Sequence, residues 1–169
     1  MRLSLIAFGK LKTPGLREAA DYYKKLTRSW ISFEEIELKP IAVPDKSPST
    51  RIQIQEKEAA LLLEKMKSDS RSESLGKSYY YLLDEVGKSL STEQWAEQFS
   101  QWETLGSTHI YLCVGSSLGF SAALRKGAKG ILSLGAQTLP HELARVVLLE
   151  QIYRACSVLK GHPYHNSGS

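Results

Sequence analysis

The sequence predicts a single α/β domain with a mostly parallel sheet and helices on both faces. Short apolar runs of the kind that form buried strands alternate along the chain with longer segments of helical period. No internal repeat, low-complexity tract or linker divides the 169 residues, of which 42% are hydrophobic and 24% charged. A chain of this size and composition is expected to form one globular domain that buries roughly two thirds of its unfolded surface.

The first part of the chain starts with an alternating pattern. Arg2–Phe8 alternates polar and apolar residues and predicts a strand, and a basic turn region follows from Gly9 to Gly15. Leu16–Leu26 places its apolar residues along one face of a helix. Ile31–Leu38 alternates again and predicts a second strand, whereas Lys39–Thr50 is rich in Pro, Ser and Lys and predicts a surface loop.

The middle of the chain holds two helix patterns around a strongly apolar strand. Arg51–Lys67 predicts a helix that the polar stretch Ser68–Lys77 should end, and Ser78–Leu83 predicts a buried strand. A capping-box pattern at Ser91 opens a second helix, which runs to about Leu105. Three aromatic side chains recur at helical spacing there and are expected to fill the core: Trp95, Phe99 and Trp102.

The last third of the chain completes the sheet. Thr108–Val114 predicts another buried strand, and a turn with Gly115 and Gly119 follows it. A short helix is expected around Ser121–Ala128, and Gly130–Ser133 predicts a last short strand. The next segment is a loop with Pro and His that leads into a long helix.

The helix from about Glu142 to Lys160 is apolar nearly all round. Such a helix must be buried on most sides, and a domain of this size cannot easily wrap its own C-terminal helix. A second copy of the chain is the natural cover, so a homodimer is expected. Glu150 and Arg154 have the i,i+4 spacing of a surface ion pair. Alternatively, Arg154 is presented to a phosphate or a substrate.

An aromatic tail with two histidines follows Gly161, a candidate helix C-cap. His162 and His165, with His141 elsewhere, have no obvious third metal ligand, and Pro163 prevents a helical histidine pair, so no metal site is expected. The tail is either a polar terminus or a substrate contact, in which Tyr164 could stack on a base and a histidine could move a proton.

Disulfide-rich, zinc-binding and membrane-spanning classes do not fit the sequence. Cys113 and Cys156 lie far apart in apolar contexts without a C-x-x-C pair, which predicts free, buried thiols. The N-terminal apolar run is too short for a signal peptide or a membrane span, so a cytoplasmic location is expected.

The net charge of +4 comes entirely from residues 121–169, which contain six basic and two acidic residues. The charges of the first 120 residues cancel. A local basic surface favours a polyanion such as nucleic acid, although a merely solvated face would have the same composition.

Three segments that follow predicted strands define a candidate pocket. They are Leu83-Asp84, Val114-Gly115 and the loop Leu134–Pro140, and in open α/β sheets ligands bind beyond such carboxyl ends. Gly115 and Gly119 would allow the backbone to approach a ligand closely. The dinucleotide fingerprint and the P-loop motif are both absent from the sequence. A nucleotide would therefore be held mainly by backbone groups, which suits a ligand without phosphates such as S-adenosylmethionine.

These residues together resemble the SPOUT-class methyltransferases. More narrowly, they resemble the bacterial family that methylates N3 of a pseudouridine in 23S rRNA, the ribosomal large-subunit methyltransferase H family. The matching stretches are MRLSLIAFGKLK, YYYLLDEVGK, YLCVGSSLGF and QTLPHELARVVLLEQIYRACSVLKGHPYH. The chain departs from the family pattern at Ser116, where a second glycine is usual, and it ends at Ser169, a few residues past the usual stop.

The resemblance implies that the C-terminal part threads a deep trefoil knot and that the protein is an obligate homodimer. It implies S-adenosylmethionine as the cofactor, bound by residues of the knot. The implied contacts are Leu83, Gly115, Leu134, Gly135, Ala136, Gln137, Thr138 and Leu139. The tail residues Tyr164 and His165 would complete the active site beside the cofactor of the other subunit.

The reaction implied by the resemblance is methyl transfer to pseudouridine N3 of 23S rRNA in the assembled ribosome. His165, Tyr164, Asp84 or water could accept the N3 proton. Arg154 and Arg145 are candidates for holding RNA phosphate or stabilising the anionic imide. Two other functions stay open, namely a non-catalytic module that binds RNA or the ribosome and a SPOUT enzyme that acts on tRNA.

Overall fold

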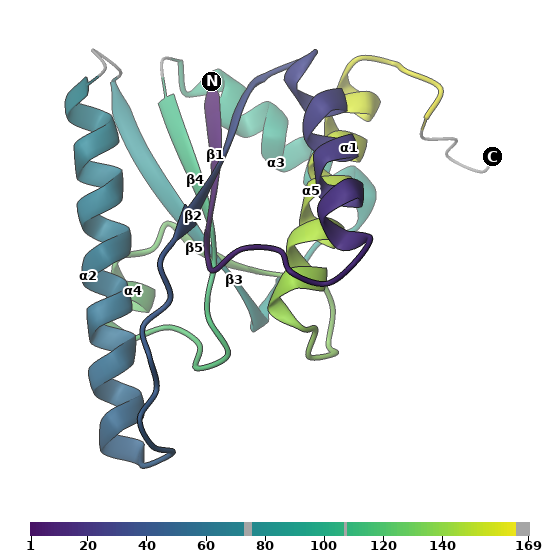
Figure 1. The fold of residues 1–169 in the computed structure, drawn as a ribbon. Coiled ribbons are helices and arrows are strands. Elements are labelled where there is room, and N and C mark those ends of the chain that lie inside the picture. The colour runs from purple at the N-terminus through teal and green to yellow at the C-terminus, as the bar shows by residue number, and fades with distance from the viewer. Residues whose placement is uncertain (73–75, 107, 165–169) are drawn as a thin grey trace.

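The computed structural model describes residues 1–72, 76–106 and 108–164. Five strands form one sheet in the order β2-β1-β4-β3-β5, and every pair of neighbours is parallel. Their carboxyl ends therefore share one edge, at the bottom of Figure 1. The bounds are Arg2–Phe8 (β1), Ser32–Leu38 (β2), Lys77–Ser89 (β3), Thr108–Val114 (β4) and Gly130–Ser133 (β5).

Helices cover both faces of the sheet, as predicted (Figure 1). The helices α1 (Leu16–Arg28), α3 (Thr92–Thr104) and α5 (His141–Leu159) pack on one face. The helices α2 (Pro48–Ser72) and α4 (Ala122–Gly127) pack on the other. Each helix buries one apolar stripe against the sheet, which produces two separate cores.

The central strand β4 contributes side chains to both cores, and all seven of its residues are buried. Because side chains alternate along a strand, Ile110 and Leu112 enter the core under α1, α3 and α5, whereas Tyr111 and Cys113 enter the core under α2. Cys113 and Cys156 are free and buried, as predicted, and burial raises the pKa of each thiol to about 12. The α3 aromatics Trp95, Phe99 and Trp102 fill the first core, also as predicted.

Helix α2 is longer than its sequence pattern predicted at both ends. It begins at Pro48, inside the segment expected to be a loop, because the fixed φ of proline suits the first turn of a helix. It continues to Ser72, so the expected break over Ser68–Lys77 is wrong for its first five positions. The ion pair between Lys65 and Asp69 (2.7 Å) supports this polar end of the helix.

Strand β3 also continues beyond its predicted end, from Leu83 to Ser89. Its register with β5 shifts after Leu83, and Lys88 then lies opposite Leu132. At the shift, a Cβ on Gly87 would lie only 2.6 Å from the carbonyl carbon of Leu132. A turn-like sequence therefore becomes strand because β5 pairs with it, and glycine is the residue that allows the two backbones to approach.

Helix α5 ends at Leu159 with Lys160 as its C-cap, and Gly161, the predicted C-cap, follows directly in a left-handed conformation with φ +63°. The next amide, of His162, donates to the Ser157 carbonyl at 2.9 Å and closes the helix end. Leu143 and Leu159 of α5 stay 36% and 37% exposed. Within the described residues, no helix has the length and apolarity needed to cross a membrane.

Candidate active site

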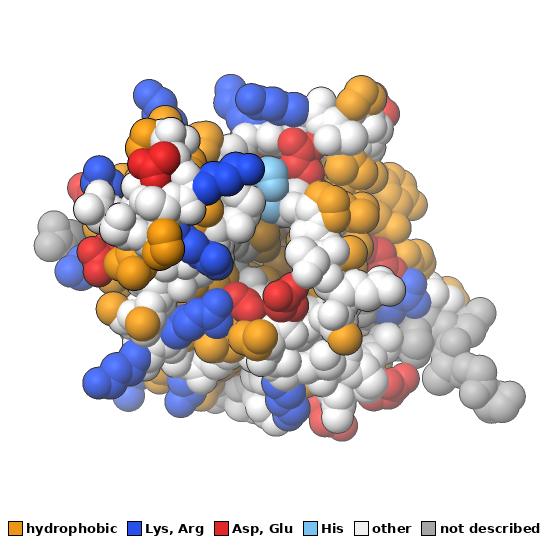
Figure 2. Space-filling model, turned by 90° about the horizontal axis from the view of Figure 1, so that it is seen from below, with side chains coloured by type: hydrophobic (Ala, Val, Ile, Leu, Met, Phe, Trp, Pro, Cys, Tyr) orange, Lys and Arg blue, Asp and Glu red, His pale blue; other side chains and the backbone are white. Residues whose placement is uncertain are grey.

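A cavity of about 660 Å³ opens at the edge of the sheet where the strands have their carboxyl ends. Most of its lining comes from three segments, 83–86 at the bend of β3, 114–120 after β4, and 134–141 between β5 and α5, and Arg51, Arg125 and Ala144 complete it. Figure 2 looks onto this end of the molecule and shows a hollow with basic side chains beside it and acidic side chains at its edge. The three segments predicted to converge on one pocket do so.

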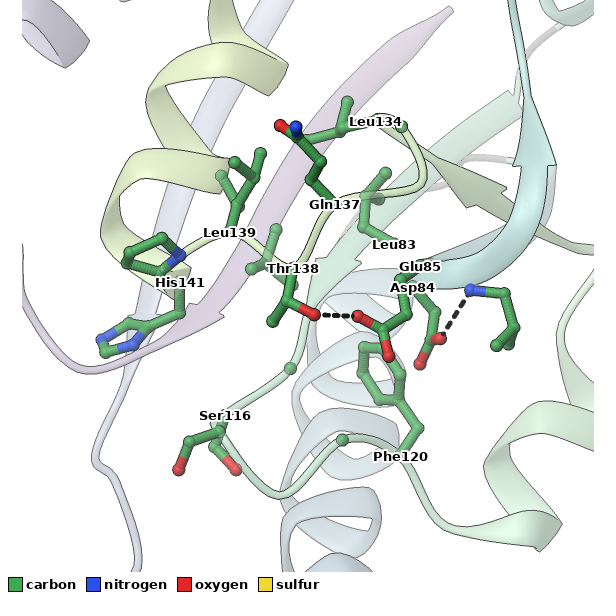
Figure 3. Close-up of a pocket in the computed structure, with 18 of the residues that line it drawn as sticks. Leu83, Asp84, Glu85, Ser116, Phe120, Leu134, Gln137, Thr138, Leu139 and His141 are labelled. Atoms are coloured by element: carbon green, nitrogen blue, oxygen red, sulfur yellow. Dashed lines mark hydrogen bonds between the residues drawn. The ribbon is translucent and has the colours of Figure 1, made fainter.

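The cavity contains seven of the eight residues that were predicted to contact a cofactor. Leu83 lies at the bend of β3, Gly115 directly follows β4, and the remaining five come from 134–139. The exception is Ala136, which is exposed in the same loop and does not line the cavity. The close-up in Figure 3 shows Leu83, Leu134 and Leu139 around the same space.

Glycines allow this part of the chain to form a close-fitting surface. A Cβ on Gly115 would lie 3.1 Å from the Phe120 ring, so a side chain there would displace the ring. Gly119 has φ +74°, and its amide closes a turn on the Ser116 carbonyl at 3.1 Å. Gly135 adopts φ +141°, which few residues other than glycine tolerate.

Two carboxylates at the bend of β3 line the cavity, and each is bonded to another segment (Figure 3). An Asp84 oxygen lies 2.5 Å from Nη2 of Arg125, and the other accepts a hydrogen bond from the Val86 amide at 3.1 Å. Glu85 accepts a hydrogen bond from the Thr138 hydroxyl, which joins β3 to the 134–141 segment. Asp84, a candidate base, is therefore ion-paired.

Comparison with known proteins identifies the family. The family described as "Predicted SPOUT methyltransferase" matches residues 1–165. The chain belongs to the SPOUT methyltransferase family. The pocket at the carboxyl ends of the sheet is thus the pocket of a SPOUT methyltransferase.

Curated relatives of this SPOUT chain match it over nearly its whole length. "Ribosomal RNA large subunit methyltransferase H" of Bacillus cytotoxicus is 37% identical over 166 residues, which cover 98% of this chain and 99% of the relative. "Ribosomal RNA large subunit methyltransferase H 1" of Clostridium perfringens is 34% identical with the same coverage. "Ribosomal RNA large subunit methyltransferase H" of Lactobacillus delbrueckii subsp. bulgaricus is 34% identical over 172 residues, again with 98% and 99% coverage. The resemblance seen in the sequence motifs is confirmed.

Arg154 and Tyr164, two of the candidate catalytic residues, lie toward the far end of α5 from the SPOUT pocket. His141 lines the pocket at the start of α5, and Arg154 follows thirteen residues later, about 20 Å along the helix. Nε of Arg154 donates to Glu150 at 2.9 Å, and its guanidinium lies 5.0 Å from the Tyr164 ring centre. The predicted pairing with Glu150 is confirmed, and 28% of the Arg154 side chain remains exposed.

Tyr164 packs back onto α5. Its hydroxyl donates to Glu150 at 3.1 Å, and its ring meets Tyr153 edge-on with centres 4.6 Å apart. Burial, together with hydrogen bonding to Tyr23 and the nearby charge of Glu150, raises the pKa of Tyr164. The candidate base His165 lies outside the described residues. Within one chain, the described tail does not reach the pocket.

The expectation that Arg145 could hold phosphate or an anionic imide is wrong. Its side chain is fully buried, and it binds Glu35 and Glu37 of β2. Position 145 faces the helix–sheet interface rather than the solvent, because it shares a helical face with Leu148, Leu149 and Ile152.

Sequence reasoning missed the contribution of α2 to the pocket. Arg51 lines the cavity directly, and Gln55 and Glu58 contact the 115–120 segment behind it. The sequence feature that could have indicated this contribution is the i, i+4, i+7 spacing of these three polar residues, which places them on one side of an otherwise amphipathic helix. In the described parts of the chain, no three His, Cys, Asp or Glu side chains are grouped to hold a metal ion.

Proposed function

We propose that this chain is an S-adenosylmethionine-dependent methyltransferase that modifies N3 of a pseudouridine in 23S rRNA of the assembled ribosome, as a homodimer. The observation that carries the proposal is the cavity of about 660 Å³, which contains nearly all of the positions that the family resemblance assigns to the cofactor. The end-to-end match to relatives named for large-subunit rRNA supports the substrate. A ribosomal substrate would place the protein in the cytoplasm.

The residues of the cavity fit this cofactor. Leu83, Val114 and Leu139 offer apolar surface for a purine ring, and the Phe120 ring packs closely against Gly115 at the wall of the same cavity. Asp84 is paired with Arg125, so Glu85 is the carboxylate that would attract a cationic ligand here. When bound, S-adenosylmethionine supplies an electrophilic methyl group on a cationic sulfonium. Its amino and sulfonium groups would suit this acidic side of the cavity.

The path of the chain supports a C-terminal trefoil knot. Strand β5 lies at the edge of the sheet beside β3, yet α5 packs against α1 and α3 on the face of the central strands. Residues 134–140 must therefore run back across the carboxyl ends of β3 and β4, next to the 115–120 segment that lines the same cavity. In a knotted chain, a later segment passes through a loop formed by an earlier one. The passage of residues 134–140 and α5 past the 115–120 segment would fit that arrangement.

The separation of the pocket from Arg154 and Tyr164 supports a homodimer. One chain cannot bring both ends of α5 to the same reacting base, because they lie about 20 Å apart. A second chain packed on the exposed Leu143 and Leu159 would cover α5 and could place its own tail beside this pocket. Each active site would then combine the cofactor pocket of one chain with the tail of the other.

The chemistry that the protein must supply is alignment and removal of the N3 proton. Alignment of the methyl donor with N3 is worth on the order of 7–11 kcal/mol in well-oriented reactions. Because its pKa is raised, Tyr164 stays protonated and is suited to donate a hydrogen bond rather than to act as the base. His165, Asp84 and water remain the proposed acceptors of the proton, and Arg154 is the proposed partner of an RNA phosphate or the imide anion.

An assay of methyl transfer to assembled ribosomes and to tRNA tests the proposal. We expect labelled methyl from S-adenosylmethionine to enter 23S rRNA of assembled ribosomes, and mass spectrometry should place it on a pseudouridine. Methyl incorporation into tRNA would favour the alternative SPOUT enzyme. Calorimetry that detects no heat of S-adenosylmethionine binding would favour the non-catalytic module.

A further inference from the structure

A buried carboxyl group lies directly behind the pocket. Glu58 of α2 is 4% exposed, and within the described residues it forms no ion pair. Its Oε2 accepts a hydrogen bond of 2.8 Å from the hydroxyl of Ser116. Burial raises the pKa of Glu58, which reflects the cost of placing a carboxylate there. The other described side chains that α2 buries are apolar, so the burial of this carboxyl group at a cost in free energy indicates a specific role for Glu58.

The partner of Glu58 organises the turn after β4. The Ser116 hydroxyl donates to Glu58 and accepts a hydrogen bond from the Leu118 amide at 3.3 Å. The Ser116 carbonyl accepts from the Gly119 amide at 3.1 Å. One residue therefore closes the turn through both its side chain and its backbone, and Glu58 orients the hydroxyl that does so.

Two more α2 side chains hold the same turn at its tip. The Leu118 carbonyl accepts hydrogen bonds from Nη2 of Arg51 at 3.1 Å and from Nε2 of Gln55 at 2.7 Å. Positions 51, 55 and 58 share one side of the helix, so three side chains of α2 form hydrogen bonds with the turn. Of these, only the Glu58 bond reaches Ser116, whose neighbours Gly115 and Ser117 line the cavity with it.

We propose that Glu58 is a positioning residue, which acts through the Ser116 hydroxyl to hold the 115–119 turn in the conformation that binds the methyl donor. The identity of the ligand rests on the proposed function, whereas the hold on the turn does not. The pair also explains why serine is accepted at a position where the resemblance leads to an expected glycine, because the hydroxyl is hydrogen-bonded to Glu58 of α2.

A double-mutant cycle on the full-length protein tests this role. Glu58→Leu and Ser116→Ala each remove one end of the hydrogen bond, and Ser116→Ala does so without altering the core under α2. We expect each variant to weaken S-adenosylmethionine binding about tenfold by calorimetry. The double variant should bind about as weakly as either single one, because both changes break one interaction. Effects that simply multiply, or unchanged affinity in Ser116→Ala, would overturn the proposal.

Two controls separate positioning from general loss of stability. Glu58→Gln keeps the shape and an acceptor oxygen and should bind the cofactor within about twofold of the parent protein. Glu56→Leu changes an exposed glutamate of the same helix and should leave affinity unchanged. Loss of affinity in Glu56→Leu equal to that in Glu58→Leu would show that α2 acts only as a scaffold.

Hydrogen exchange of the unliganded protein distinguishes failure of this inference from failure of the proposed function. Because Leu118 and Gly119 amides are bonded to Ser116, we expect them to exchange faster in Ser116→Ala and Glu58→Leu than in the parent protein. Unchanged exchange would refute the role of Glu58 whatever the ligand is. A parent protein that binds no S-adenosylmethionine would refute the proposed cofactor, and the exchange rates would still decide whether Glu58 holds the turn.

Discussion

Arg145 and Glu35 form a buried ion pair that joins α5 to β2. Nη2 of the guanidinium lies 2.5 Å from Oε1 of Glu35, and the two side chains are 0% and 5% exposed. Arg145 also contacts Glu37 at 2.7 Å and donates to the Gly9 carbonyl at 3.0 Å. From α1, Lys24 contacts Glu35 at 2.6 Å. The guanidinium thus has carboxylate and carbonyl partners on several sides, as a buried charge requires.

Replacing Arg145 should therefore damage stability strongly. Arg145→Ala leaves Glu35 without its main buried counter-charge, and we expect the free energy of unfolding in urea to fall by about 3–5 kcal/mol. Arg17→Ala is the matched control, because Arg17 reaches Glu37 from a site that is 38% exposed and should contribute less than about 1 kcal/mol. Equal, small losses in both variants would contradict this account of the network.

His109 should make the fold sensitive to mild acid. Burial, with a smaller effect of the Arg2 charge, lowers the pKa of His109 from 6.5 to about 4. The unfolded chain binds a proton near pH 6.5 and the folded one only near pH 4, so stability is complete above pH 6.5 and falls as the pH decreases between these values. The full loss should be about 3 kcal/mol by linkage.

Urea unfolding at several pH values tests the effect of His109. His109→Gln should lack most of the decline between pH 6.5 and 4, because glutamine does not titrate. His141→Gln, which replaces an exposed histidine, should retain it. A decline of the same size in His109→Gln would assign the acid sensitivity to other groups.

Gly87 should be required for the bend of β3. A Cβ at this position would meet the carbonyl carbon and oxygen of Leu132 at 2.6 and 2.7 Å, and backbone atoms cannot move aside as a side chain can. We expect Gly87→Ala to destabilise the protein by about 1–3 kcal/mol in urea unfolding. Gly130→Ala, in which the nearest atoms belong to the Tyr81 ring at 3.1 Å, should cost less. The reverse order would argue against the close approach of β3 and β5.

The tail should act on methyl transfer rather than on cofactor binding. Under the proposed function, Tyr164→Ala and His165→Ala remove groups beside the substrate and not from the cavity, so turnover should fall at least about tenfold while the Kd of S-adenosylmethionine stays within about twofold. Steady-state kinetics on ribosomes and calorimetry measure the two quantities. Full activity in both variants would exclude the tail from the mechanism.

The strands were predicted well from the sequence because burial on both faces of a parallel sheet leaves near-continuous apolar runs. Thr108–Val114 and Gly130–Ser133 have the predicted bounds, and the capping box predicted at Ser91 is present, with the Gln94 amide donating to its hydroxyl. The predictions were wrong mainly at the ends of helices and strands. The β3 extension past Leu83 depends on pairing with β5, which lies far along the chain.

The candidate pocket was also largely predictable, since the carboxyl ends of parallel strands must meet at one edge. Gly115 and the 134–139 loop could be assigned to it on that ground and by resemblance. Arg145 could not be placed in the same way. A basic residue on a helix indicates solvent or phosphate, and only the position of Glu35 and Glu37 on β2 shows that it is buried.

Hydrophobic periodicity reports which faces of each element are buried, so the α/β class, the order of strands and helices along the chain, and the loops that carry the site could be predicted from it. The polar pairs across packed elements, among them Glu58 with Ser116 and Arg145 with Glu35, are visible only in the folded chain. A hydrogen bond or ion pair between distant segments leaves no periodic trace in either one. It forms from the distance and direction that packing imposes on both.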